Sequence, residues 1–146
     1  MNKEKIAEAL AKLLAESYVL ALKTQNYHWH VKGEHFYSLH NLFEEQYDEL
    51  NDCIDEIAER IRMLGFASPA TFKEFLALSG IAEGDSSKDA KAMLNDLSQS
   101  HETLAKTANN LAKIAGDNDD AVSAGIADER KAAHDKAVWF LKSIIA

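Results

Sequence analysis

The chain has 146 residues, 47% of them hydrophobic and 27% charged, a balance that predicts one globular domain spanning residues 1–146. Sixteen basic against twenty-four acidic residues give a formal net charge of −8, which argues against unassisted nucleic-acid binding, because phosphate affinity comes from clustered lysine and arginine. The single cysteine, Cys53, excludes an intrachain disulfide. Since no apolar run reaches the roughly 20 residues of a membrane span and no signal peptide is recognisable, we expect a cytoplasmic protein.

Long helices are expected from one proline and six glycines in a chain rich in alanine, leucine, lysine and glutamate. Apolar residues recur at helical spacing over residues 3–31, and Gly33 ends this first helix. The second helix is predicted over residues 37–64 and ends at Gly65.

A short amphipathic helix is predicted over residues 71–78, after a start signal at Ser68-Pro69. Residues 86–89 (Ser-Ser-Lys-Asp) have the pattern of a capping box, which opens a third long helix that continues to about residue 114 and is closed by Gly116.

A fourth long helix is predicted over residues 120–145, after an acidic turn at residues 117–120. Short loops make the first and second helices antiparallel, and likewise the third and fourth, whereas the longer middle connection permits a crossover. The sequence therefore predicts an all-α fold: a ferritin-like four-helix bundle with a short extra helix between the second and third long helices.

Two histidines and three carboxylates stand at intervals that suit a metal site. His28 precedes the turn at Gly33 and His40 follows it, so an antiparallel hairpin places both imidazoles at similar height. Glu44 lies one turn beyond His40. Asp55 and Glu59 form a second pair, but Asp55 is about 22 Å from His40 along one helix, at roughly 1.5 Å per residue. One chain therefore cannot easily gather all five ligands.

A dimer resolves this difficulty. An isologous contact, with the two second helices antiparallel, would bring the histidines of one chain to the carboxylates of the other and give each dimer two identical sites. Oxygen-rich ligation with imidazole suits Fe(II), Mn(II) or Zn(II). The Glu-x-x-His motif of an intrachain di-iron bundle is absent from the sequence. The competing interpretation of this row of ionisable groups is a solvated helix face.

Several of these residues resemble the motifs of the Dps family, the DNA-binding proteins from starved cells, and their ferritin-like relatives. The resemblance covers nearly the whole chain and includes the short central helix; its motifs are His28-Trp29, Gly33, Leu39-His40, Glu44, Asp55-x-x-x-Glu59-Arg60 and Lys136-x-x-Trp139-Phe140-Leu141. It implies a hollow dodecamer built from dimers, which oxidises Fe(II), preferably with hydrogen peroxide, and stores Fe(III) inside, protecting against oxidative stress.

Carried over residue by residue, the resemblance assigns metal binding and ferroxidase catalysis to five residues, with two irons, or Zn or Mn in their place, at each inter-subunit site: His28, His40, Glu44, Asp55 and Glu59. Asp48 is a secondary candidate ligand on the same helix face. Three further acids resemble residues that line cation-entry pores in the family, with helix capping as the competing interpretation: Asp117, Asp120 and Asp128. His101 and His134 have no carboxylate constellation that the sequence identifies.

DNA binding is the family property that the sequence supports least. We expect none at physiological salt, because no lysine-rich tail is visible and a dodecamer would carry about −96 formal charges. A second class of function stays open, a nucleoid, DNA-protecting or interaction protein with a non-ferroxidase metal site. The sequence also leaves open whether hydrogen peroxide or dioxygen is the oxidant.

Overall fold

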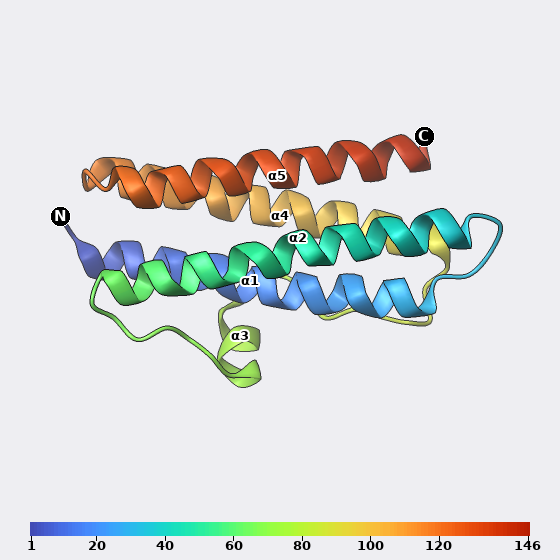
Figure 1. The fold of residues 1–146 in the computed structure, drawn as a ribbon, viewed down its shortest axis with the longest axis horizontal. Coiled ribbons are helices and arrows are strands. Elements are labelled where there is room, and N and C mark those ends of the chain that lie inside the picture. Colours follow the sequence, from blue (N-terminus) through green and yellow to red (C-terminus); the bar gives the residue numbers. More distant parts are fainter.

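The computed structural model describes all 146 residues and contains five helices and no strands. Four long helices form a bundle: α1 (Lys3–His30), α2 (Phe36–Met63), α4 (Ala90–Asp117) and α5 (Ala121–Ile145). The short helix α3 (Phe72–Leu78) lies beside α1, on the side away from α5 (Figure 1). This is the all-α bundle, with an extra helix in the middle connection, that the sequence predicts.

The helices form two antiparallel hairpins, α1 with α2 and α4 with α5, and these two pairs share the most extensive contacts. The chain leaves α2 at one end of the bundle, passes through α3, and returns along the bundle to begin α4 at the other end (Figure 1). This long crossover is the connection typical of ferritin-like folds.

The start of α3 differs from the prediction, because Pro69 lies before the helix and Thr71 is its N-cap. The Thr71 hydroxyl oxygen accepts a hydrogen bond from the backbone N–H of Glu74, while the Glu74 carboxylate accepts one from the N–H of Ala70. This pairing satisfies one free N–H group of the first turn, that of Glu74, and the N–H of Ala70 just before the N-cap. It also lowers the pKa of Glu74, through the hydrogen bonds from Ala70 and Thr71.

The start of α4 is also later than predicted. Asp89 caps this helix, with its carboxylate accepting from the backbone N–H of Ala92 at 2.8 Å. Ser87 instead donates from both its backbone N–H and its hydroxyl to Asp85, in a local turn that keeps these residues outside the helix. At the other end α4 continues through Gly116, and the left-handed conformation falls on Asp119, with a φ of 57°.

The core is formed by the inward faces of the four long helices, where fully buried side chains include Leu10, Leu14, Leu20, Phe43, Ile57, Leu97 and Leu104. None of the five helices combines the length and the apolar character that crossing a membrane requires. One charged side chain, Glu16, is completely buried within this core.

Glu16 connects three parts of the fold. Its carboxylate accepts hydrogen bonds from the backbone N–H of Gly80 at 2.8 Å and from the hydroxyl of Thr107. A Cβ at Gly80 would come within 2.9 Å of the Glu16 carboxylate, so any other residue there would require this carboxylate to shift. The carboxylate therefore fixes the segment after α3 against both α1 and α4.

We expect Glu16→Ala to destabilise the protein by about 2 kcal/mol, because the buried hydroxyl of Thr107 and the partly buried N–H of Gly80 lose their acceptor. Glu16→Gln is the matched control: its amide oxygen keeps one acceptor and its shape fills the same space, so the loss should be smaller. Thermal denaturation at equal protein concentration measures both. Equal melting temperatures for Glu16→Ala and the wild type would contradict a structural role for this carboxylate.

Candidate metal centre

His28 and His40 face each other where the α1–α2 hairpin turns. Their rings stack, with centroids 3.7 Å apart and planes inclined by 13°. The Nδ1 of His28 donates to the backbone oxygen of His40 at 2.6 Å, and the Nδ1 of His40 donates to the backbone oxygen of His28 at 2.7 Å. A carbonyl oxygen can only accept, so both Nδ1 atoms carry the proton. Each Nε2 is left with a lone pair, as a metal-binding histidine requires.

The hairpin that creates this pair depends on a short connection. Gly33 adopts a φ of 113°, a left-handed conformation that glycine takes at little steric cost. The ring of Phe36 stacks on His40 at 5.0 Å, and the ring of Tyr47 meets the edge of His28 at 5.4 Å. These aromatic contacts hold the imidazoles from both sides, and His28 is only 7% exposed.

Acidic residues flank the histidine pair on α2. Glu44 and Asp48 are exposed and lie one and two turns after His40. Partial burial raises the pKa of Tyr47, and the negative charges of Glu44 and Asp48 raise it further, so these carboxylates lie close to the ring beside His28. Trp29, by contrast, is 60% exposed.

Asp55 and Glu59 form the second half of the predicted ligand set. Both are exposed on α2, one turn apart, and neither forms an ion pair with a basic residue. A hydrogen bond shared with Asp55, together with the negative charge of Asp55, raises the pKa of Glu59. Two adjacent carboxylates without a counter-charge are a candidate half-site for a cation.

The two halves do not meet within one chain. No group of three or more histidine, cysteine, aspartate or glutamate side chains is arranged to hold a metal ion. The structure brings the histidines together and the carboxylates together, but about 22 Å of α2 separates His40 from Asp55. The inter-subunit arrangement of the site therefore stays a prediction.

The acids that resemble pore residues differ in their surroundings. Asp120 is buried and caps α5: its carboxylate accepts from the N–H and hydroxyl of Ser123 and from the Arg60 guanidinium at 2.8 Å. Although burial opposes it, the hydrogen bonds from Ser123 and the charge of Arg60 lower the pKa of Asp120. Both carboxylate oxygens thus have internal partners, as helix capping requires, whereas Asp117 and Asp128 are exposed.

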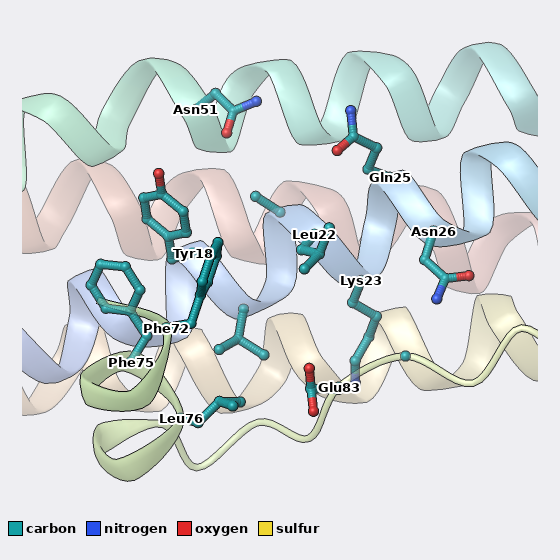
Figure 2. Close-up of a pocket in the computed structure, with 13 residues that line it drawn as sticks. Tyr18, Leu22, Lys23, Gln25, Asn26, Asn51, Phe72, Phe75, Leu76 and Glu83 are labelled. Carbon is teal, nitrogen blue, oxygen red and sulfur yellow. The ribbon is translucent and has the colours of Figure 1, made fainter. Parts of the chain in front are cut away.

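An apolar groove, which sequence reasoning missed, lies between α1 and α3 and extends to Asn51 on α2. Its volume is about 550 Å³. Figure 2 shows side chains from α1 and α3 facing one another across it; its apolar lining includes Tyr18, Leu22, Phe72, Phe75 and Leu76. Phe72 is 72% exposed, and such a patch of apolar side chains commonly marks an interaction surface. The available signal was the aromatic pair of the short helix α3, of which Phe75 is buried and Phe72 is exposed.

A family model described as a ferritin-like domain matches residues 7–146, which defines the class of the protein. DNA protection during starvation protein 2 of Bacillus anthracis is 36% identical over 145 residues, covering 99% of both chains. Antigen TpF1 of Treponema pallidum is 37% identical over 93% of this chain and 77% of that protein. Within the ferritin-like class, this chain belongs to the Dps family.

Solved structures agree with this membership. Dps from Staphylococcus aureus superposes with a TM-score of 0.96, at 34% identity over 99% of this chain and 97% of that one. A Dps protein from Vibrio cholerae, described as a member of a broad superfamily of ferritin-like diiron-carboxylate proteins, gives 0.95 at 30% identity, over 99% and 91%. The ferritin-like fold and the family predicted from the motifs are both confirmed.

Proposed function

We propose that this protein is a mini-ferritin of the cytoplasm that oxidises Fe(II) at inter-subunit sites and stores Fe(III) in a hollow dodecamer, which protects against oxidative stress. The observation that carries this proposal is the reciprocal hydrogen bonding of His28 and His40. It fixes two stacked imidazoles in the tautomer that binds metal, next to the acidic residues of α2. Glu44 is the carboxylate best placed to join them.

The apolar groove supports the participation of a second copy. Asn51 borders the groove, and Asp55 and Glu59 follow at intervals of one turn along the same face of α2. In a symmetric dimer, this surface of one chain would pack against the same surface of the other chain. Exposed apolar side chains such as Phe72 and Leu22 would then be buried in the interface. It would also pass beside the carboxylate pair, where its histidines complete the site.

The chemistry follows from the ligands. Carboxylates and neutral imidazoles bind Fe(II) through oxygen and nitrogen, and also accept Mn(II) or Zn(II). Two Fe(II) ions held together each give one electron to hydrogen peroxide, whose O–O bond breaks to yield two Fe(III) and two hydroxide ions. Because both electrons arrive together, no hydroxyl radical is released. The diiron-carboxylate superfamily of the Vibrio cholerae relative supports a pair of irons at each site.

DNA protection is the alternative function, and the name of the Bacillus anthracis relative supports it. The formal charge of −8 per chain opposes it, because an acidic assembly repels phosphates. Iron oxidation also agrees better with the ordered histidine pair, which contact with DNA does not need.

Peroxide-driven Fe(II) oxidation should fall at least about tenfold in a His28→Ala/His40→Ala variant, toward the rate in buffer, because both nitrogen ligands are lost. The measurement adds Fe(II) anaerobically to metal-free protein, then hydrogen peroxide or air, and follows near-ultraviolet absorbance. His30→Ala is the matched control, since His30 is exposed and its Nδ1 bonds only to Asn26. Wild-type rates in the double variant would refute the proposed site, and comparison of the two oxidants identifies the preferred one.

A further inference from the structure

A second polar cluster, separate from the candidate metal centre, lies inside the bundle between α2, α4 and α5. Arg130 is only 5% exposed and forms two hydrogen bonds with Glu49, from Nη1 to Oε2 at 2.5 Å and from Nη2 to Oε1 at 2.8 Å. The same Nη2 lies 3.3 Å from the Nε2 of His134. The Nδ1 of His134 lies in turn 2.8 Å from the Nδ1 of His101, and both histidines are buried. Polar contacts therefore cross the bundle from α2 through α5 to α4.

The direction of each hydrogen bond in this cluster can be deduced. A guanidinium can only donate, so Nε2 of His134 accepts from Arg130 through its lone pair. The proton of neutral His134 is therefore on Nδ1 and is donated to Nδ1 of His101. His101 then carries its own proton on Nε2, which is buried and has no partner within the chain. Burial and the charge of Arg130 lower the pKa of His101 to about 3, in agreement with two neutral rings.

Two further buried polar atoms also have no partner within the chain, the hydroxyl oxygen of Ser98 and the amide oxygen Oε1 of Gln46. Ser98 is only 3% exposed. Hydroxyls buried in a helix commonly donate to the carbonyl four residues earlier, as those of Ser17 and Thr24 do at 2.7 Å. The Ser98 hydroxyl makes no such bond, so it remains available to another group.

The register of α2 and α5 fixes the height of Gln46 in the bundle. These helices run antiparallel (Figure 1), and Cys53 and Arg130 line one cavity between them. Seven residues make about two helical turns, so the same register brings Gln46 opposite Ala137. At this height α5 contributes only the methyl group of an alanine.

The register of α4 and α5 places Ser98 in the same layer. These helices are also antiparallel, and His101 meets His134. Three residues make slightly less than one turn, so Ser98 lies opposite Ala137. The unpartnered atoms of Gln46, Ser98 and His101 thus fall within about one turn of one another, roughly 5 Å along the bundle.

The chemistry of these three atoms decides what could bind among them. The N–H at Nε2 of His101 needs an acceptor, Oε1 of Gln46 needs a donor, and the Ser98 hydroxyl serves as either. A metal ion cannot accept a hydrogen bond from an N–H, and a halide ion cannot donate one to a carbonyl oxygen. A water molecule does both, and an internal water makes about three hydrogen bonds.

We propose that His101, Ser98 and Gln46 bind one ordered water molecule in the core of each chain. The water accepts from Nε2 of His101, donates to Oε1 of Gln46 and bonds with the Ser98 hydroxyl. It thereby closes a ring of polar contacts that connects three helices through Glu49 and Gln46 on α2, Arg130 and His134 on α5, and His101 on α4. This inference does not depend on the proposed ferroxidase activity.

A crystal structure of the whole assembly at about 1.5 Å resolution tests the proposal directly. Electron density for one water should lie within about 3.2 Å of Nε2 of His101, Oγ of Ser98 and Oε1 of Gln46 in every subunit. A direct hydrogen bond between Gln46 and His101, or the lack of a water that bonds to all three atoms, would show that the proposal is wrong.

The melting temperatures of two variants, measured at equal protein concentration, give a second test whose sign decides. If the water is bound, Ser98→Ala and Gln46→Met each remove one of its hydrogen bonds and should lower the melting temperature by about 2–4 °C. If these groups had no partner, the same changes would remove an unsatisfied polar group and raise it.

Ser17→Ala is the matched control for Ser98→Ala. It makes the same change of helix propensity at a buried position, where the hydroxyl bonds only to the carbonyl oxygen of Leu13 in its own helix. Ser98→Ala should therefore melt at a lower temperature than Ser17→Ala, and Gln46→Met at a lower temperature than the wild type. An equal or higher melting temperature in either comparison would contradict the bound water.

Discussion

Fe(II) oxidation should be restored when two inactive variants are combined in one assembly. His28→Ala/His40→Ala subunits keep the carboxylate half of the site, and Asp55→Ala/Glu59→Ala subunits keep the histidine half. In a mixed dimer one of the two sites combines both intact halves, while the other combines both altered halves. Random pairing of equal amounts makes about half of the dimers mixed, so about one quarter of the sites should be complete. Peroxide-driven oxidation in co-expressed assemblies should therefore reach about a quarter of the wild-type rate.

The matched control combines His28→Ala subunits with His40→Ala subunits. Both changes affect the same half of the site, so no pairing restores it and activity should stay at the level of the separate variants. If the whole site lay within one chain, the result would differ. The oxidation rate of neither mixture would then exceed the rates of the separate variants from which it was made. The comparison is made on assemblies of equal size by gel filtration, so that loss of assembly is not mistaken for loss of a site.

Acid should destabilise this protein more than a variant that lacks the buried His101. The folded-state pKa of His101 is lowered to about 3 by burial and by the charge of Arg130, against about 6.5 for an unperturbed histidine. Between these values the unfolded chain binds a proton that the folded chain does not. Stability is therefore unaffected above about pH 6.5 and falls as the pH drops from 6.5 toward 3. From pH 7 to pH 4.5 the loss amounts to about 2–3 kcal/mol.

His101→Asn is the variant to compare, because its amide oxygen still accepts the hydrogen bond from Nδ1 of His134 but does not titrate. On acidification from pH 7 to pH 4.5, the melting temperature of the wild type should fall by roughly 5–10 °C more than that of the variant. Burial, together with His101 and Arg130, lowers the pKa of His134, and this histidine is present in both proteins. Equal falls in melting temperature would show that His101 does not contribute to acid sensitivity.

The long helices were predictable because each carries a continuous apolar stripe with the helical period. In so long a segment, a few residues that depart from the pattern do not change the prediction of a helix. The starts of α3 and α4 were not, because several neighbouring residues there are able to act as caps. Thr71 and Asp89 take that role in the structure, while Ser87 is engaged with Asp85. Such competition is decided by backbone geometry, which residue type alone does not specify.

Within the candidate site, the proximity of the two histidines was predictable. A hairpin at Gly33 brings His28 beside His40, and their spacing revealed it. The exchange of hydrogen bonds with backbone carbonyls was not visible, since it depends on ring orientation.

The buried polar residues were overlooked because a charged residue is ordinarily assigned to the surface. A signal was available, because Glu16 and Arg130 occupy positions at which the helical period places core residues.

The acceptors that orient the two histidines are main-chain atoms. The capacity to bind metal is therefore insensitive to most substitutions at neighbouring positions. No substitution at another position removes a carbonyl oxygen, so drift in neighbouring side chains leaves the protons of His28 and His40 in place as long as the turn at Gly33 persists. Loss of one histidine also leaves its own carbonyl available to the other ring. Each histidine therefore keeps its tautomer without the other ring. Both remain able to bind metal as long as the hairpin is formed.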